Sequence, residues 1–129
     1  MAGLPPSSEL NVQFAHSAYR LAERFAPRLP EVAHFQTWTK EETEARIGEA
    51  DVLVVSGFWD NAFLEKAERL KFIQVCAAGF DQFDQQAIRM AGVRLANSAG
   101  VNANAVSDHA IALLLGLTRQ IHVARDNQK

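Results

Sequence analysis

Short runs of apolar and β-prone residues recur along this chain at nearly even spacing, and this recurrence limits the folds it can adopt. Each run has the length of a buried strand, and a helical pattern lies between most successive runs. Strands that alternate with helices indicate βαβ units and a parallel sheet. The runs occupy residues 11–17, 31–38, 51–57, 71–79 and 93–100.

We therefore predict an α/β fold built on a three-layer, doubly wound, flavodoxin-like sheet. The expected sheet has five parallel strands in the order 2-1-3-4-5. A length of 129 residues is enough for one domain with one sizeable core. A long helix follows the last strand and ends the chain.

Capping residues and apolar spacing predict where the helices lie. Thr39 and Glu42 form a capping-box pattern. Asp84 caps a short helix that Gly92 closes. The expected helices cover 19–29 (ended early by Pro27), 41–50, 61–70 (capped by Asp60 or Asn61), 84–92, and 105 to about 126.

The carboxyl ends of parallel strands meet at one edge of a sheet, where doubly wound domains bind their ligands. The segments expected there are rich in small residues and nearly free of charge. Around Ala78 and Gly79, this composition lets a carboxylate approach the backbone N–H groups. The alternative is that Gly79 only supplies a positive φ where the strand turns. The segments are His16–Ser17, Ser56–Trp59, Ala77–Phe80 and Ser98–Asn102.

Missing motifs exclude several other classes of doubly wound domain. No two of the seven glycines are separated by a single residue, so the G-x-G-x-x-G dinucleotide fingerprint is absent. The segments at the ends of the first and third runs, AHSAY and VSGFW, lack the acids of a phosphoacceptor receiver, and HSAYRL is not the phosphate loop of a flavodoxin. The sequence has no P-loop. Its four histidines and single cysteine show no metal-ligand spacing.

Charge and hydropathy limit the partners and the compartment that we expect. A net charge of −2, with acids and bases mixed, predicts binding to neither nucleic acid nor an anionic membrane. The uncharged apolar stretch Ala110–Leu117 is too short to span a bilayer, and the N-terminal residues lack a signal-peptide pattern. We expect a cytoplasmic protein in which Cys76 is a buried, reduced residue.

From the fourth run onward the chain carries a longer composite pattern. It reads LKFIQVCAAGFDQFD and then AGVRLANSAGVNANAVSDHAIALLLGLTR. This pattern resembles the NAD(P)-dependent D-isomer-specific 2-hydroxyacid dehydrogenases, densely from Asp51 to Arg119 and more weakly from Asn11 to Ala50. Members of that family have two doubly wound domains. The resemblance implies that residues 1–129 are the substrate (catalytic) domain, truncated before the domain that binds NAD or NADP.

The same resemblance implies an oxidoreductase that interconverts small D-2-hydroxy and 2-keto acids by hydride transfer. The catalytic Arg, Glu and His of the family have no counterpart here, so we expect this chain alone to be inactive. Backbone N–H groups of Ala78, Gly79 and Phe80 would bind the substrate carboxylate. Phe58 and Trp59 either shape the far wall of the substrate pocket or cover the core.

Two further residues match family positions near the nicotinamide. Asn102 would contact substrate there, or it caps the long helix. Val106 would lie near the nicotinamide, or it is an ordinary core valine. Residues 110–117 are apolar on all sides of that helix, which favours a homodimer. The alternatives are a non-catalytic binding or regulatory relative of the same fold, or a structural domain without a ligand.

Overall fold

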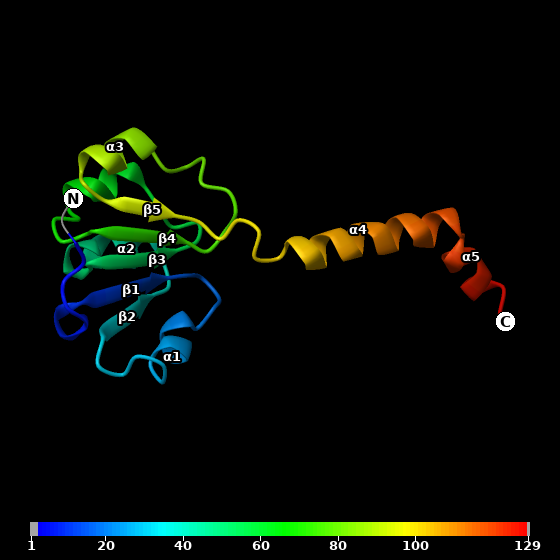
Figure 1. Ribbon diagram of the computed structural model, residues 1–129, viewed down its shortest axis with the longest axis horizontal. Coiled ribbons are helices and arrows are strands. Elements are labelled where there is room, and N and C mark those ends of the chain that lie inside the picture. Colours follow the sequence, from blue (N-terminus) through cyan, green and yellow to red (C-terminus); the bar gives the residue numbers. More distant parts are fainter. Residues whose placement is uncertain (1–2, 129) are drawn as a thin grey trace. The chain divides into compact units, whose positions relative to one another are not determined.

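A single parallel sheet organises the first part of the chain. The computed structural model describes residues 3–128 (Figure 1). The sheet has five strands in the order β2-β1-β3-β4-β5, and every neighbouring pair is parallel. This confirms the predicted sheet and its strand order. The strands are β1 (Asn11–Ala15), β2 (Ala33–Thr37), β3 (Val52–Val55), β4 (Phe72–Val75) and β5 (Arg94–Ala96).

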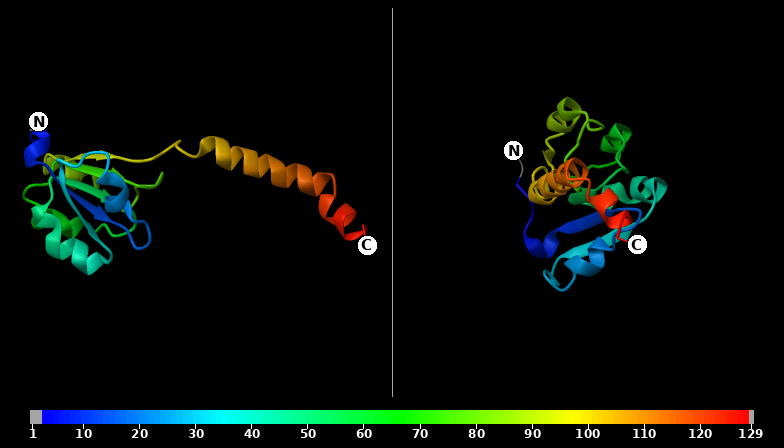
Figure 2. Two further views of the ribbon diagram at one scale, coloured as in Figure 1. Left: turned by 90° about the horizontal axis from the view of Figure 1, so that it is seen from below. Right: turned by 90° about the vertical axis from the view of Figure 1, so that its right-hand side faces the viewer.

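Helices pack on both faces of the sheet, which explains why the strands read as continuous apolar runs (Figures 1 and 2). On one face Leu53 and Val55 pack in a cluster with Ile47, Phe63 and Ile88, which lie in or beside the helices of that layer. The elements of this layer are α2 (Lys40–Arg46), α3 (Gln85–Met90) and the 3₁₀ helices η2 (Ile47–Glu49) and η3 (Asn61–Glu65).

The opposite face carries a smaller cluster under α1 (Leu21–Phe25). The rings of Phe14 and Phe25 lie 5.2 Å apart there, centroid to centroid. Val54 and Phe72, on the neighbouring strands β3 and β4, remain only half-buried. A further 3₁₀ helix, η1 (Ser7–Glu9), precedes β1.

The predicted helix caps at Thr39 and Asp84 are confirmed with one difference. The N–H of Glu42 donates to Thr39 Oγ1 at 3.1 Å, as a capping box requires, but the Glu42 carboxylate accepts from the N–H of Trp38 instead of Thr39. Asp84 caps α3 by accepting hydrogen bonds from two backbone N–H groups. Gly92, with φ 73°, lies just past the end of that helix.

Two predicted helices differ from the structure. The expected helix over 61–70 is only η3, because successive bonds in this stretch join residues three apart, as from Lys66 N–H to Phe63 O. The expected helix over 105–126 is divided into α4 (Ala103–Thr118) and α5 (Ile121–Asp126). The break occurs at Gln120, whose φ of 52° is left-handed and cannot continue an α-helix.

The chain divides into two compact units after Ser98, and each is described by itself. The first contains the sheet. The second contains α4 and α5, and α4 contributes no buried residue. Its apolar side chains include Leu113, Leu114 and Leu115, each more than half exposed, at 56%, 56% and 54%.

The predicted burial of Cys76 is wrong. This residue follows the last residue of β4 and is exposed. Because side chains alternate along a strand, Cys76 continues the row of Phe72 and Gln74 and not the row of the buried Val75. The thiol is nevertheless partly desolvated, and this raises its pKa.

Candidate functional site

The segment after β4, residues 76–84, has an unusual distribution of backbone hydrogen bonds; we name it the Gly79 loop. Several of its carbonyl groups accept hydrogen bonds within the unit. The carbonyl of Ala77 accepts from the N–H of Ser98 at 3.0 Å, and that of Ala78 accepts from Asn97 Nδ2 at 2.7 Å. The carbonyl of Phe80 accepts from the N–H of Phe83 at 3.0 Å, which closes a turn.

Three consecutive N–H groups of the same loop are available. No acceptor among residues 3–128 bonds the N–H of Ala78, Gly79 or Phe80. Ala78 and Gly79 are also exposed. With carbonyls engaged and amides available, the loop presents a local excess of positive dipole, which is the property of an anion-binding backbone segment.

The conformation of Gly79 does not explain why a glycine stands there. Its φ lies outside the left-handed region, unlike that of Gly57, Gly92 and Gly100. A Cβ built on Gly79 would meet only Asp81 Oδ2, at 3.9 Å, within the protein. The alternative that Gly79 only supplies a positive φ is therefore wrong. Neither backbone strain nor crowding by this chain requires the missing side chain.

The two aromatic residues predicted near the site occupy different environments. Trp59 is 6% exposed and belongs to the core, where its ring stacks on Phe83 at 5.2 Å. Its Nε1 donates to Asn61 Oδ1 at 2.9 Å. Of the two roles considered for Trp59, the structure shows the core-covering one. Phe58 is half-buried and packs against the same core cluster.

Asn102 and Val106 belong to the second unit. Asn102 stands at the N-cap position of α4, but its side chain makes no capping hydrogen bond. Val106 lies one turn into α4 and is 58% exposed. Of the predicted site residues, the first unit thus contains Phe58, Trp59, Ala78, Gly79 and Phe80.

Two residues that shape the Gly79 loop were not assigned this role from the sequence. Asn97, just after β5, holds the carbonyl of Ala78. Asn61 was considered only as a helix cap, but Asp60 caps η3 by accepting from the N–H of Ala62. Each asparagine side chain donates a hydrogen bond to a loop carbonyl that lies at least nineteen positions away in the sequence. Local patterns carry no signal for such contacts.

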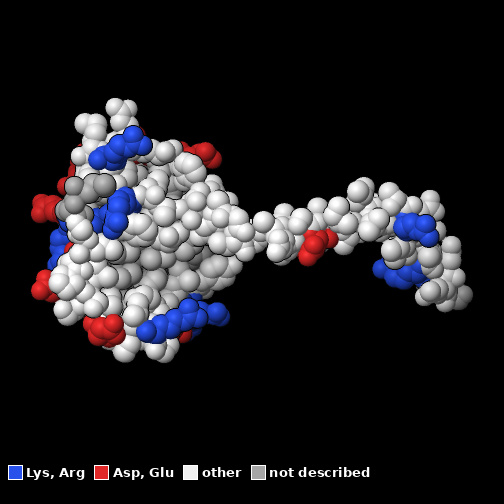
Figure 3. Space-filling model, viewed as in Figure 1, with Lys and Arg blue, Asp and Glu red and all other residues white. Residues whose placement is uncertain are grey.

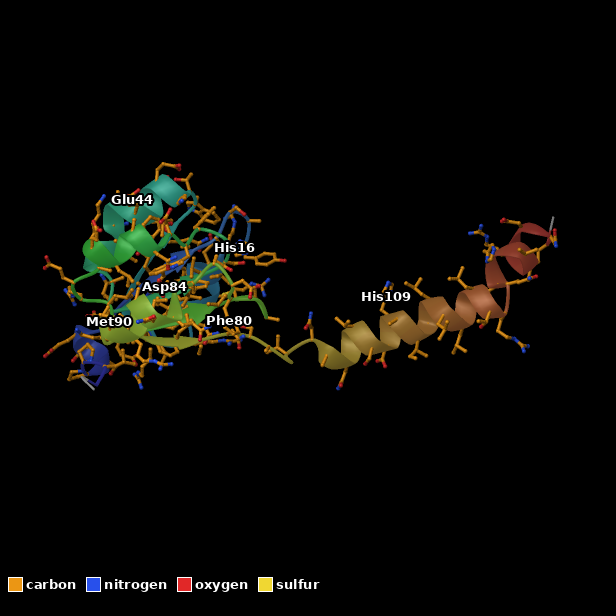
Figure 4. The ribbon with its side chains drawn as sticks, turned by 90° about the horizontal axis from the view of Figure 1, so that it is seen from above. His16, Glu44, Phe80, Asp84, Met90 and His109 are labelled. Carbon is orange, nitrogen blue, oxygen red and sulfur yellow. The ribbon has the colours of Figure 1, made fainter. Side chains whose placement is uncertain are left out.

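His16, which follows β1, is held in one tautomer by its own turn. Its Nδ1 accepts from the N–H groups of Ala18 and Tyr19, both at 3.0 Å, so the ring proton lies on Nε2. The ring also stacks on that of Tyr19, with 4.3 Å between centroids. Figure 4 shows His16 and Phe80 toward the same end of the first unit.

The loop itself carries two acids, Asp81 and Asp84. Figure 3 shows the surface around the carboxyl ends of the strands as largely uncharged. A groove along α3 and β5 shares Phe80 and Asn97 with the neighbourhood of the loop and carries Arg89 and Arg94. Within residues 3–128, no three His, Cys, Asp or Glu side chains gather as metal ligands would.

Comparison with known proteins agrees with this architecture. Residues 12–126 match the family described as D-isomer specific 2-hydroxyacid dehydrogenase, catalytic domain. An erythronate-4-phosphate dehydrogenase of Chromohalobacter salexigens is 32% identical over 102 residues, which are 78% of this chain and 26% of that protein. A glyoxylate reductase of Thermococcus litoralis is 37% identical over 78 residues, 59% of this chain and 24% of that protein.

A solved D-isomer specific 2-hydroxyacid dehydrogenase family protein from Aeromonas salmonicida superposes with a TM-score of 0.72 at 26% identity. The match covers 94% of this chain and 39% of that one. The chain spans about a quarter of the length of the curated relatives it matches. In the part of the chain that the structure describes, no helix is long and apolar enough to cross a membrane. The chain belongs to the D-isomer specific 2-hydroxyacid dehydrogenase family.

Proposed function

We propose that this chain is the substrate-binding part of an NAD(P)-dependent oxidoreductase that interconverts D-2-hydroxy acids and 2-keto acids by hydride transfer. The observation that carries the proposal is the Gly79 loop, whose available N–H groups at Ala78, Gly79 and Phe80 suit a carboxylate. The family match supports the reaction class.

The role of this chain in the reaction is binding and orientation. Two or three N–H groups that donate to one carboxylate bind the substrate through the group that all 2-hydroxy and 2-keto acids share. They leave the hydroxyl or keto carbon of the substrate to be presented to other groups.

The dinucleotide is not assigned to residues of this chain. The seven glycines do not form the G-x-G-x-x-G fingerprint that places a pyrophosphate at a helix N-terminus. We therefore propose that NAD or NADP, together with the acid–base pair, is held outside these residues. Asn102 and Val106 remain proposed contacts near the nicotinamide. A homodimer and a cytoplasmic location complete the proposal.

A titration of the ¹⁵N-labelled chain with pyruvate, followed by NMR, tests the binding role. We expect saturable shifts of the Ala78, Gly79 and Phe80 amides. Pyruvamide, which lacks the charge, is the matched control and should shift them much less. An equal response to both compounds, or none to pyruvate, would contradict the proposal. If the chain binds pyruvate but shows no turnover when it is joined to a dinucleotide-binding domain, the non-catalytic alternative is favoured.

A further inference from the structure

Asn61 connects the segment after β3 to the Gly79 loop through one side chain. Its Oδ1 accepts from Trp59 Nε1 and from the N–H of Asp84, both at 2.9 Å. Its Nδ2 donates to the carbonyl of Gln82 at 3.2 Å. A single exposed amide therefore joins a core tryptophan to two backbone groups of the loop.

An apolar contact joins the same two segments. The rings of Trp59 and Phe83 stack with an interplanar angle of 21°, and these residues are only 6% and 4% exposed. Phe83 also donates its N–H to the carbonyl of Phe80. Consequently, the residues just downstream of the available amides are fixed both by the stack and by the Asn61 hydrogen bonds.

The other end of the loop is fixed independently. The N–H of Cys76 donates to the carbonyl of Val55 at 2.9 Å. The carbonyls of Ala77 and Ala78 accept hydrogen bonds from Ser98 and Asn97, which follow β5. The amides of Ala78, Gly79 and Phe80 thus lie between two anchored points. Asn61 belongs to the anchor on the α3 side.

We propose that Asn61 is a positioning residue, which sets the directions of the loop amides before a carboxylate arrives. This inference rests on the proposed function of the same loop. Donors already oriented in the free protein bind more tightly, because ordering them costs no free energy at the moment of binding. Asn61 acts through the backbone of residues 80–84 and need not touch the substrate.

The test compares three variants of the chain. Asn61→Ala removes all three hydrogen bonds. Trp59→Phe keeps an aromatic ring for the stack, leaves the two hydrogen bonds from Asn61 to the loop, and removes the indole donor together with part of the buried ring. Asn11→Ala is the matched control, because Asn11 Nδ2 donates to the carbonyl of Glu49 at the opposite end of the sheet.

Two readouts are needed: the Kd for pyruvate, and the ¹⁵N relaxation order parameters of residues 78–80 without ligand. For Asn61→Ala we expect at least tenfold weaker binding and lower order parameters, while the amide shifts of β3 and β4 stay unchanged. Trp59→Phe should give a smaller loss of affinity. Asn11→Ala should match the wild type in both.

Unchanged affinity and order in Asn61→Ala would overturn the positioning role and leave the proposed function intact. A wild-type chain that does not respond to pyruvate would overturn the proposed function and this inference together. If Asn61→Ala fails to fold, Asn61→Leu, which has a similar shape and also removes all three hydrogen bonds, decides: wild-type affinity and order in that variant would reject the positioning role.

Discussion

The guanidinium of Arg69 donates to the carboxylate of Asp51 at 2.8 Å, where the amino ends of β3 and β4 begin. The Asp51 side chain is only 6% exposed, and that of Arg69 is 52% exposed. The same carboxylate accepts from the N–H of Asn11 at 2.9 Å and so ties β1 into this end. The group lies at the opposite edge of the sheet from the Gly79 loop, so stability and carboxylate binding should be separable by mutation.

Asp51→Ala should lower the free energy of unfolding by about 1–3 kcal/mol, because partly buried donors lose their acceptor. Arg69→Gln should cost less, since water can reach that half-exposed position. Urea denaturation measures both. Pyruvate binding by either folded variant should equal that of the wild type. A large loss of affinity in folded Asp51→Ala would show that the two ends are coupled.

Gly79→Ala should leave the fold intact and weaken carboxylate binding at least tenfold. The added methyl fits the protein, whose nearest atom lies 3.9 Å away, and the backbone there is not left-handed. It does occupy space on the loop where an anion would approach. Thermal unfolding and a pyruvate titration measure the two effects.

Gly92→Ala provides the contrast, because Gly92 has a φ of 73°. An alanine in this conformation costs about 1–2 kcal/mol. We therefore expect Gly92→Ala to reduce stability while pyruvate binding by the folded fraction is kept. The opposite pattern, a stable Gly92→Ala and an unstable Gly79→Ala, would contradict the account of both glycines.

The sheet could be predicted from the sequence because strand periodicity and helix caps are local. Thr39 and Asp84 each bond N–H groups two or three residues away, so their patterns are visible in a short window. The role of Asn61 and the break in the last helix could not be predicted, because neither has a local signal. No residue near Asn61 in the sequence predicts its hydrogen bond with the N–H of Asp84. No sequence pattern predicts the left-handed conformation of Gln120, where the helix breaks.

The position of the Gly79 loop could be predicted, but the hydrogen bonds that occupy its carbonyl groups could not. Small residues after a strand place the loop at the carboxyl edge of the sheet. Its polarity depends on carbonyls engaged by Ser98 and Asn97, which follow a different strand. These contacts become visible only when β4 and β5 are paired.

Cys76 should react slowly with iodoacetamide at neutral pH, although it is exposed. Partial desolvation raises the pKa of its thiol, and only the thiolate is the nucleophile. The pH midpoint of alkylation should therefore lie above that of a free cysteine derivative in the same buffer. The rates are measured by mass spectrometry. A midpoint below the reference would mean that a nearby positive charge, and not desolvation, dominates.

Lys40→Gln should raise the pKa of Asp60, which can be followed by ¹³C NMR of its carboxyl group. The hydrogen bond from Lys40 Nζ, 2.7 Å long, is the main reason that this pKa is lowered. A lowered pKa in the folded state stabilises the fold above the unfolded pKa, and this contribution disappears as the pH falls through the folded value. Lys66→Gln, which removes a partner of Glu44 instead, is the matched control.

The apolar helix α4 should cause the chain to self-associate. Ile111, Leu114 and Leu117 are 55%, 56% and 67% exposed, and burying this remaining surface stabilises the associated form by about 1–2 kcal/mol for each side chain. Sedimentation velocity should show a dimer whose population rises with concentration. Replacing Leu114 and Leu117 together by Glu should shift the equilibrium to monomer, whereas Asn104→Asp on the same helix should not. A monomer at high concentration in the wild-type chain would reject the homodimer, and it would leave the Gly79 loop as a site within one protomer.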